Sequence, residues 1–139
     1  MNKFLSILLI TLFSLNGFAQ KKQYKVLPVG FYNVENLFNP ENDTTKLDED
    51  FTPGGDYHYT YEVYNQKLHN IATVLSKMAT DVTPEGCAII GIAEIENDLA
   101  LNDLLKQPEL AARGYKYIWF PTPDVRGIST ALLYNPKYF

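Results

Sequence analysis

The sequence predicts an α/β domain in which a sheet is layered with helices. Three observations lead to this class. An apolar run at residues 87–93 lacks alternation, residues 61–79 have the apolar spacing of a helix, and β-branched or aromatic segments lie on either side of them. The chain of 139 residues is long enough for one ordinary domain, and it contains no repeat or low-complexity tract.

The first expected strand covers residues 24–34, which are rich in β-branched and aromatic residues, and it ends near Asn33. A polar stretch follows at 39–60, where Pro, Asn, Asp, Thr and Gly occur without apolar periodicity. We expect a long loop there. The acidic residues of this stretch lack the spacing of a calcium-binding loop. We therefore expect a solvated loop that covers a cleft.

Residues 61–79 are expected to form a helix, because their apolar side chains recur at intervals of four, three, four and three. These residues are Tyr64, Leu68, Ile71, Leu75 and Met78. The segment 80–86 contains Pro84 and Gly86, and it ends the helix.

The apolar run 87–93 is typical of a strand that is buried on both faces. Asn97 or Asp98 can cap a short helix after it. Two further strands are expected, an aromatic one at 115–120 and a final one at 130–134. The order strand, helix, strand, helix, strand, strand suits a sheet layered with helices.

Two polar residues stand where expected strands end: Asn33 after the first strand and Glu94 after the apolar run. They would lie on the same rim of the sheet if the two strands are parallel neighbours. A carboxylate at such a position is costly to bury, and a hard divalent cation with oxygen ligands is a common compensation. The spacing alone leaves open that Glu94 simply emerges into solvent.

Three segments together resemble signatures of the endonuclease/exonuclease/phosphatase superfamily, the deoxyribonuclease I-like proteins. They are FYNVENLF at 31–38, IGIAEIEN at 90–97 and DVRGISTALLY at 124–134. The resemblance covers residues 24–139 and implies a two-sheet α/β sandwich flanked by helices, incomplete in this chain. It also implies cleavage of phosphoester bonds with Mg²⁺, or with Mn²⁺ or Ca²⁺ as alternatives.

The resemblance assigns roles to three residues. Glu94 would be the metal-binding carboxylate, and Asn33 would lie beside the metal and the scissile phosphate, so both are candidate catalytic and metal-site residues. Arg126 is a candidate for contact with a substrate phosphate, and its alternative interpretation is an exposed loop arginine. An asparagine is suited to phosphoester cleavage, because its amide donates hydrogen bonds without adding negative charge near the phosphate.

The superfamily's later Asp-x-Asn and Ser-Asp-His motifs do not occur in this chain, and neither His58 nor His69 can be assigned as a general base. We therefore expect an N-terminal portion of a secreted nuclease that is inactive by itself. The alternatives are a non-catalytic truncated product or binding module on the same scaffold, and a phosphatase acting on sugar or lipid phosphates.

Residues 1–19 have the order of a secretory signal peptide, with Lys3 at the front, an apolar stretch and small residues up to Ala19. Cleavage near Ala19 would leave residues 20–139 as the mature chain, secreted or periplasmic. A membrane anchor would need about 20 continuous apolar residues, and polar residues interrupt this run. We expect no stable membrane association.

The formal net charge is −4 at pH 7, so the chain has no general attraction for polyanions. A phosphodiester substrate, with nucleic acid favoured, would need positive charge supplied locally by a bound cation or a placed arginine. Cys87 is the single cysteine and is expected to be structural. No oligomer is predicted.

Overall fold

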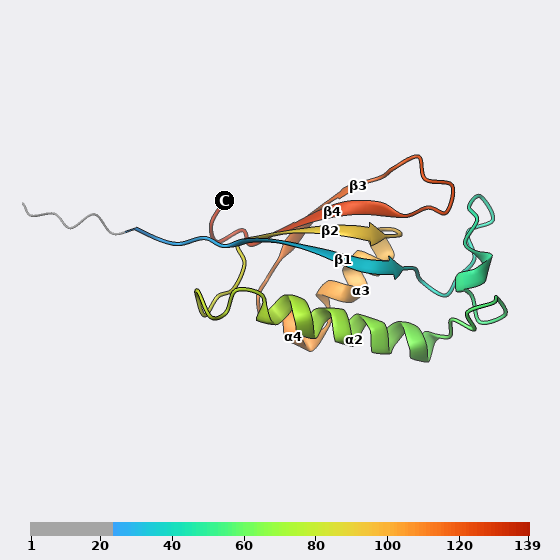
Figure 1. The fold of residues 1–139 in the computed structure, drawn as a ribbon, viewed down its shortest axis with the longest axis horizontal. Coiled ribbons are helices and arrows are strands. Elements are labelled where there is room, and N and C mark those ends of the chain that lie inside the picture. The colour runs from blue at the N-terminus through green and yellow to red at the C-terminus, as the bar shows by residue number, and fades with distance from the viewer. Residues whose placement is uncertain (1–23) are drawn as a thin grey trace, which may run out of the picture.

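The computed structural model describes residues 24–139, which form one four-stranded sheet with helices beneath it (Figure 1). The strands are β1 (Val29–Leu37), β2 (Ile89–Ile95), β3 (Lys116–Phe120) and β4 (Ser129–Tyr134), in the order β1-β2-β4-β3. β1 and β2 are parallel, and the other two neighbouring pairs are antiparallel. The predicted signal peptide lies outside the described residues.

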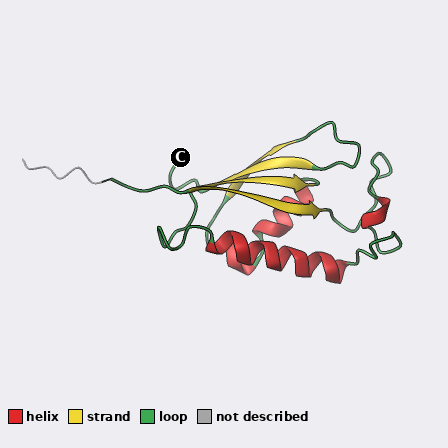
Figure 2. Cartoon of the chain, in the orientation of Figure 1, coloured by secondary structure: helices red, strands yellow, loops and turns green. Residues whose placement is uncertain are grey.

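The helices α2 (Tyr61–Lys77), α3 (Asp98–Leu105) and α4 (Pro108–Ala111) all lie on one side of the sheet (Figure 2). A short 3-10 helix, η1 (Glu49–Phe51), interrupts the long loop between β1 and α2. Side-chain caps begin the two longer helices: Thr60 accepts the N–H of Val63 at 3.3 Å, and Asn97 accepts that of Ala100 at 3.0 Å. None of the described helices is long and apolar enough to cross a membrane.

The core lies between the sheet and its helices. The predicted apolar stripe of α2 is buried there, apart from Met78, which follows the helix and packs against the core. Fully buried side chains from the strands and from α3 complete the core, including Ile90, Ile92, Leu133, Leu101 and Leu104. The helix periodicity and the α/β class are therefore confirmed. The described residues supply one sheet of the expected two-sheet sandwich.

The expected burial of β2 on both faces is wrong for the described residues. Ile90, Ile92 and Ile95 are buried, whereas the alternate positions are half-exposed. The helices cover one face, and the small residues of β2 on the other face are only partly covered by their neighbours. A Cβ on Gly91 would meet the ring of Phe31 at 3.0 Å, so that ring lies close over the glycine.

The first strand begins later and ends later than expected. Residues 24–28 have no regular structure, because Pro28 lacks the N–H that a strand ladder uses and restricts the residue before it. β1 then continues past Asn33 to Leu37 through an irregular segment, which carries the candidate site.

Candidate active site at the carboxyl end of two parallel strands

The candidate site occupies the point where the pairing of β1 and β2 becomes irregular. The two strands stay in register up to Asn33 and Ala93, and pairing resumes at Leu37 and Ile95. Three residues of β1 therefore oppose the single residue Glu94. The ladder between β2 and β4 also shifts register at Glu94. Such bulges redirect side chains and occur preferentially near active sites.

Three residues at this irregularity have a left-handed backbone. Their φ angles are 55° for Glu35, 59° for Asn36 and 66° for Glu94. Residues other than glycine adopt this conformation at a cost of roughly 1–3 kcal/mol each, so the surrounding contacts must hold it in place. Strain of this kind clusters at functional sites.

The strained backbone aims donors at one carboxylate. Asn33 Nδ2 donates to Glu94 Oε1 at 3.0 Å, and the backbone N–H of Asn36 donates to Glu94 Oε2 at 3.1 Å. The N–H of Glu35 donates to Asn33 Oδ1 at 2.8 Å, which fixes the orientation of the Asn33 amide. The structure thus brings Asn33 and Glu94 together, as expected for parallel neighbouring strands, and each Glu94 oxygen keeps acceptor capacity for a further partner.

Lys67 is a neighbour of the site that the sequence interpretation missed. Its ammonium group, extended from α2, donates to the carbonyl oxygens of Glu35 and Asn36, the latter at 3.1 Å. Burial lowers the Lys67 pKa, and the negative charges of Glu35 and Glu94 oppose that effect. The one available signal was helical spacing, which places Lys67 one turn from the buried residues Tyr64 and Ile71.

Glu96 lies two residues after Glu94 and is 5% exposed. Its Oε2 accepts the N–H of Asn39 at 2.7 Å, which attaches the start of the long loop to the end of β2. Burial raises the Glu96 pKa to about 7, and the nearby charges of Asp48 and Asp43 also raise it. Glu96 therefore fastens the loop beside the site. Asn97, which follows it, is the cap of α3.

Arg126 lies in the loop between β3 and β4, at the same end of the sheet as Asn33 and Glu94 (Figure 1). Its side chain pairs with Asp124 through Nη2 at 3.2 Å and Nε at 3.3 Å, and these hydrogen bonds lower the Asp124 pKa. The structure therefore places the loop of Arg126 at the same end of the sheet as Asn33 and Glu94, with its guanidinium paired to Asp124.

A family model identifies the protein family to which this chain belongs. The model of the endonuclease/exonuclease/phosphatase family matches residues 28–139. The chain belongs to this family. Its members are in general hydrolases of phosphoester bonds that use divalent metal ions. Comparisons with curated proteins and with solved structures found no match.

The residues present fit the divalent ion that the family uses. Within residues 24–139 no group of three His, Cys, Asp or Glu side chains could hold a metal. Glu94 is the carboxylate that lies at the irregular end of β2. Mg²⁺ is commonly held by one or two carboxylates together with water and substrate phosphate. Glu94 suits this arrangement, because its two oxygens are oriented by separate donors and stay open to a further partner.

Neither histidine of the described residues contacts Asn33 or Glu94 at the candidate site. His69 Nδ1 pairs with Glu109 Oε1 at 2.9 Å on the surface between α2 and α4. His58 is exposed in the long loop. Both positions agree with the interpretation that these side chains are surface residues.

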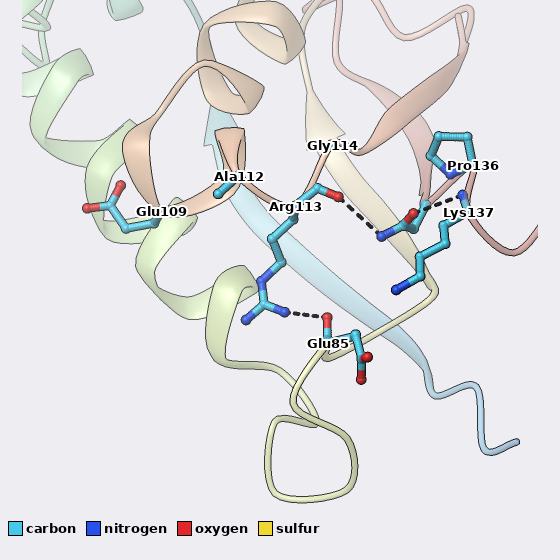
Figure 3. Close-up of a pocket in the computed structure, with 8 residues that line it drawn as sticks. Glu85, Glu109, Ala112, Arg113, Gly114, Pro136 and Lys137 are labelled. Carbon is cyan, nitrogen blue, oxygen red and sulfur yellow. Dashed lines mark hydrogen bonds between the residues drawn. The ribbon is translucent and has the colours of Figure 1, made fainter.

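A hollow of about 650 Å³ lies at the opposite end of the sheet from the candidate site and is shown in Figure 3. Its arginine, Arg113, donates to the backbone carbonyls of Glu85 and Ser76, so its guanidinium holds loops together. The Asn135 amide donates to the Arg113 carbonyl at 3.1 Å. These contacts engage the Arg113 guanidinium and the Asn135 amide in holding the backbone, whereas Glu109 Oε2 is buried without a hydrogen-bond partner.

Proposed function

We propose that this family member is a metal-dependent phosphodiester hydrolase whose divalent cation binds at Glu94. The observation that carries the proposal is the carboxylate at the irregular end of β2, with one oxygen held by the Asn33 side chain and the other by the Asn36 amide. A site built on strained backbone of two parallel strands is pre-organised for one geometry.

The residues have distinct roles in this proposal. Glu94 supplies the charged oxygen ligand for Mg²⁺, Mn²⁺ or Ca²⁺. The bound ion would polarise the phosphoryl oxygen and offset charge on the leaving group. The Asn33 amide nitrogen has two N–H groups, and one of them is taken by Glu94. The second can donate to a phosphate oxygen as negative charge develops there. Asn33 therefore orients the metal ligand and contacts the substrate.

Nucleic acid is the substrate class we favour, in a secreted or periplasmic location. The net charge of −4 provides no general attraction for it, so binding depends on charges placed at the site. Arg126 lies at the same rim and is the candidate for contact with a flanking phosphate. Sugar or lipid phosphates are the alternative substrates, and parallel assays with DNA and with a sugar phosphate separate them.

A non-catalytic protein on the same scaffold is the second candidate. It is favoured by the position of the two histidines, neither of which contacts Glu94 in the part of the chain that the structure describes. No imidazole is therefore in place to activate water. We expect residues 20–139 alone to bind a divalent ion at Glu94 without turning over a phosphodiester.

The test is Glu94→Gln, which preserves shape and removes the charge. Mn²⁺ binding by the chain, followed by electron paramagnetic resonance, should weaken at least about 10-fold. Turnover of DNA by the protein as the cell makes it should fall about 100-fold or more under limiting Mg²⁺. Glu85→Gln, an exposed acid at the far end of the sheet, is the matched control. Equal Mn²⁺ affinity in the Glu94→Gln variant and the wild type would refute the proposal.

A further inference from the structure

The side chain of Lys67 connects α2 to the irregular segment of β1. Its ammonium group donates to two successive carbonyl oxygens, those of Glu35 and Asn36. Lys67 is half-buried, whereas Lys77 on the same helix is exposed. A lysine normally keeps its ammonium group in water, so its use on two backbone carbonyls indicates a specific task.

That task follows from the backbone conformation of the two residues. Glu35 and Asn36 both have a left-handed backbone, which is unfavourable for residues other than glycine and less so for asparagine than for glutamate. Their carbonyl oxygens converge on the single ammonium group, while the Asn36 N–H points to Glu94 Oε2. Hydrogen bonds to a charged donor are stronger than those between neutral groups. Lys67 can therefore stabilise this segment in the one conformation that directs its amide at the carboxylate.

We propose that Lys67 is a positioning residue for the metal site, holding the 35–36 backbone so that the Glu94 carboxylate is oriented for its cation. The inference rests on the proposed function for its metal and on the observed contacts for its geometry. Lys67 reaches Glu94 through the Asn36 amide, because its own hydrogen bonds are to Glu35 and Asn36.

Positioning and simple electrostatics give opposite expectations for removal of the charge. The Lys67 ammonium lies close enough to Glu94 for their charges to interact. If charge alone mattered, its loss would make the site more negative and would strengthen cation binding. If positioning dominates, the loss of the Lys67 hydrogen bonds leaves the 35–36 backbone, and with it the Glu94 carboxylate, less well oriented. Cation binding should then weaken. The sign of the change separates the two.

The experiment replaces Lys67 by Met, which keeps the aliphatic length and removes the donors. Lys77→Met on the same helix is the matched control. In the full chain, Mn²⁺ affinity should fall about 10-fold for Lys67→Met and stay unchanged for Lys77→Met. Unchanged or tighter binding in the Lys67→Met variant would overturn the inference.

A second readout needs no metal. In the nuclear magnetic resonance spectrum of the metal-free chain, the Asn36 amide proton should be shifted downfield by its bond to Glu94. Lys67→Met should move it upfield, toward the value in Glu94→Ala, while Lys77→Met leaves it in place. An Asn36 signal that Lys67→Met does not move would contradict the positioning role. This result holds even if Glu94→Gln shows that no metal binds, so the two proposals can fail separately.

A third readout uses the wild type and does not depend on a variant that folds. The Lys67 ammonium protons should exchange with water more slowly than those of Lys77, because two of them are held by carbonyl oxygens. Equal exchange rates for the two lysines would show that the hydrogen bonds are not maintained, and the inference would then be abandoned.

Discussion

Asn33 and Glu94 are 61 positions apart in the chain, and the Asn33 amide donates to the Glu94 carboxylate at 3.0 Å. Rotating the Asn33 amide by 180° would break two hydrogen bonds, because its oxygen already accepts the N–H of Glu35 at 2.8 Å. Reversal would place two acceptors face to face at Glu94 and two donors face to face at Glu35. The side chain is therefore fixed by contacts on both of its ends.

Replacing Asn33 by Ala should remove both the support of Glu94 and the proposed donor to the phosphate. We expect kcat to fall about 100-fold for the protein as the cell makes it. Mn²⁺ affinity should also weaken, because Glu94 Oε1 loses its partner. Asn70→Ala on the exposed side of α2 provides the control. Steady-state kinetics with a DNA substrate give the measurement, and wild-type kcat in Asn33→Ala would refute the role.

The sequence predicted the local features of the fold well. The helix expected at 61–79 is α2, because the spacing of its apolar residues is a local property that the helix itself satisfies. The expectation that Asn33 and Glu94 share a rim depended on parallel strands, and the parallel pairing of β1 and β2 is observed. Burial of β2 on both faces was wrong for the described residues, because the helices described by the structure all lie on one side of the sheet.

The parts of the site that the sequence could not predict are long-range. The contacts of Lys67 span 31 or 32 positions, and they depend on where α2 lies against the sheet. The left-handed conformation of Glu35 and Asn36 has no glycine to indicate it. Such a conformation is imposed by tertiary contacts, so neither the strain nor the lysine that contacts the strained backbone is visible in composition or periodicity.

Export is tested at the N-terminus. The signal peptide expected over residues 1–19 should be removed, so that mass spectrometry of the exported protein finds its first residue at or near Gln20. Leu8→Arg places a charge in the apolar stretch and should leave the chain inside the cell with its N-terminus uncut. A wild-type protein that retains Met1 would exclude the predicted cleavage.

Arg126 and Asp124 give a matched pair for substrate binding. Arg126→Gln should raise KM for a short DNA duplex several-fold with little change in kcat, because a contact to a flanking phosphate is made equally in the ground and transition states. Asp124→Asn should lower KM, since it frees the guanidinium from its present partner. Both effects should shrink at high salt. Identical KM values in the two variants and the wild type would rule out the contact.

Tyr59 and Tyr64 pack together in the core with ring centroids 6.4 Å apart, yet their hydroxyl groups differ. The Tyr59 hydroxyl is buried without a hydrogen-bond partner, whereas the Tyr64 hydroxyl donates to Asp103 Oδ2 at 3.2 Å. A buried polar group without a partner costs free energy, and a satisfied one contributes about 1 kcal/mol. Tyr59→Phe should therefore raise the free energy of unfolding by about 1 kcal/mol at pH 8, and Tyr64→Phe should lower it by a similar amount.

The same substitution at Tyr59 should change the response to alkali. Burial, followed by the charge of Glu96, raises the Tyr59 pKa from its ordinary value of 10 to about 12. The folded chain therefore favours the neutral phenol, and the stability that this provides is present below pH 10 and is lost as the pH rises toward 12. Phenylalanine does not ionise, so the stabilising effect of Tyr59→Phe should be larger at pH 11 than at pH 8. Urea unfolding at the two pH values measures the difference, and an equal effect at both would show that Tyr59 is not shielded from water.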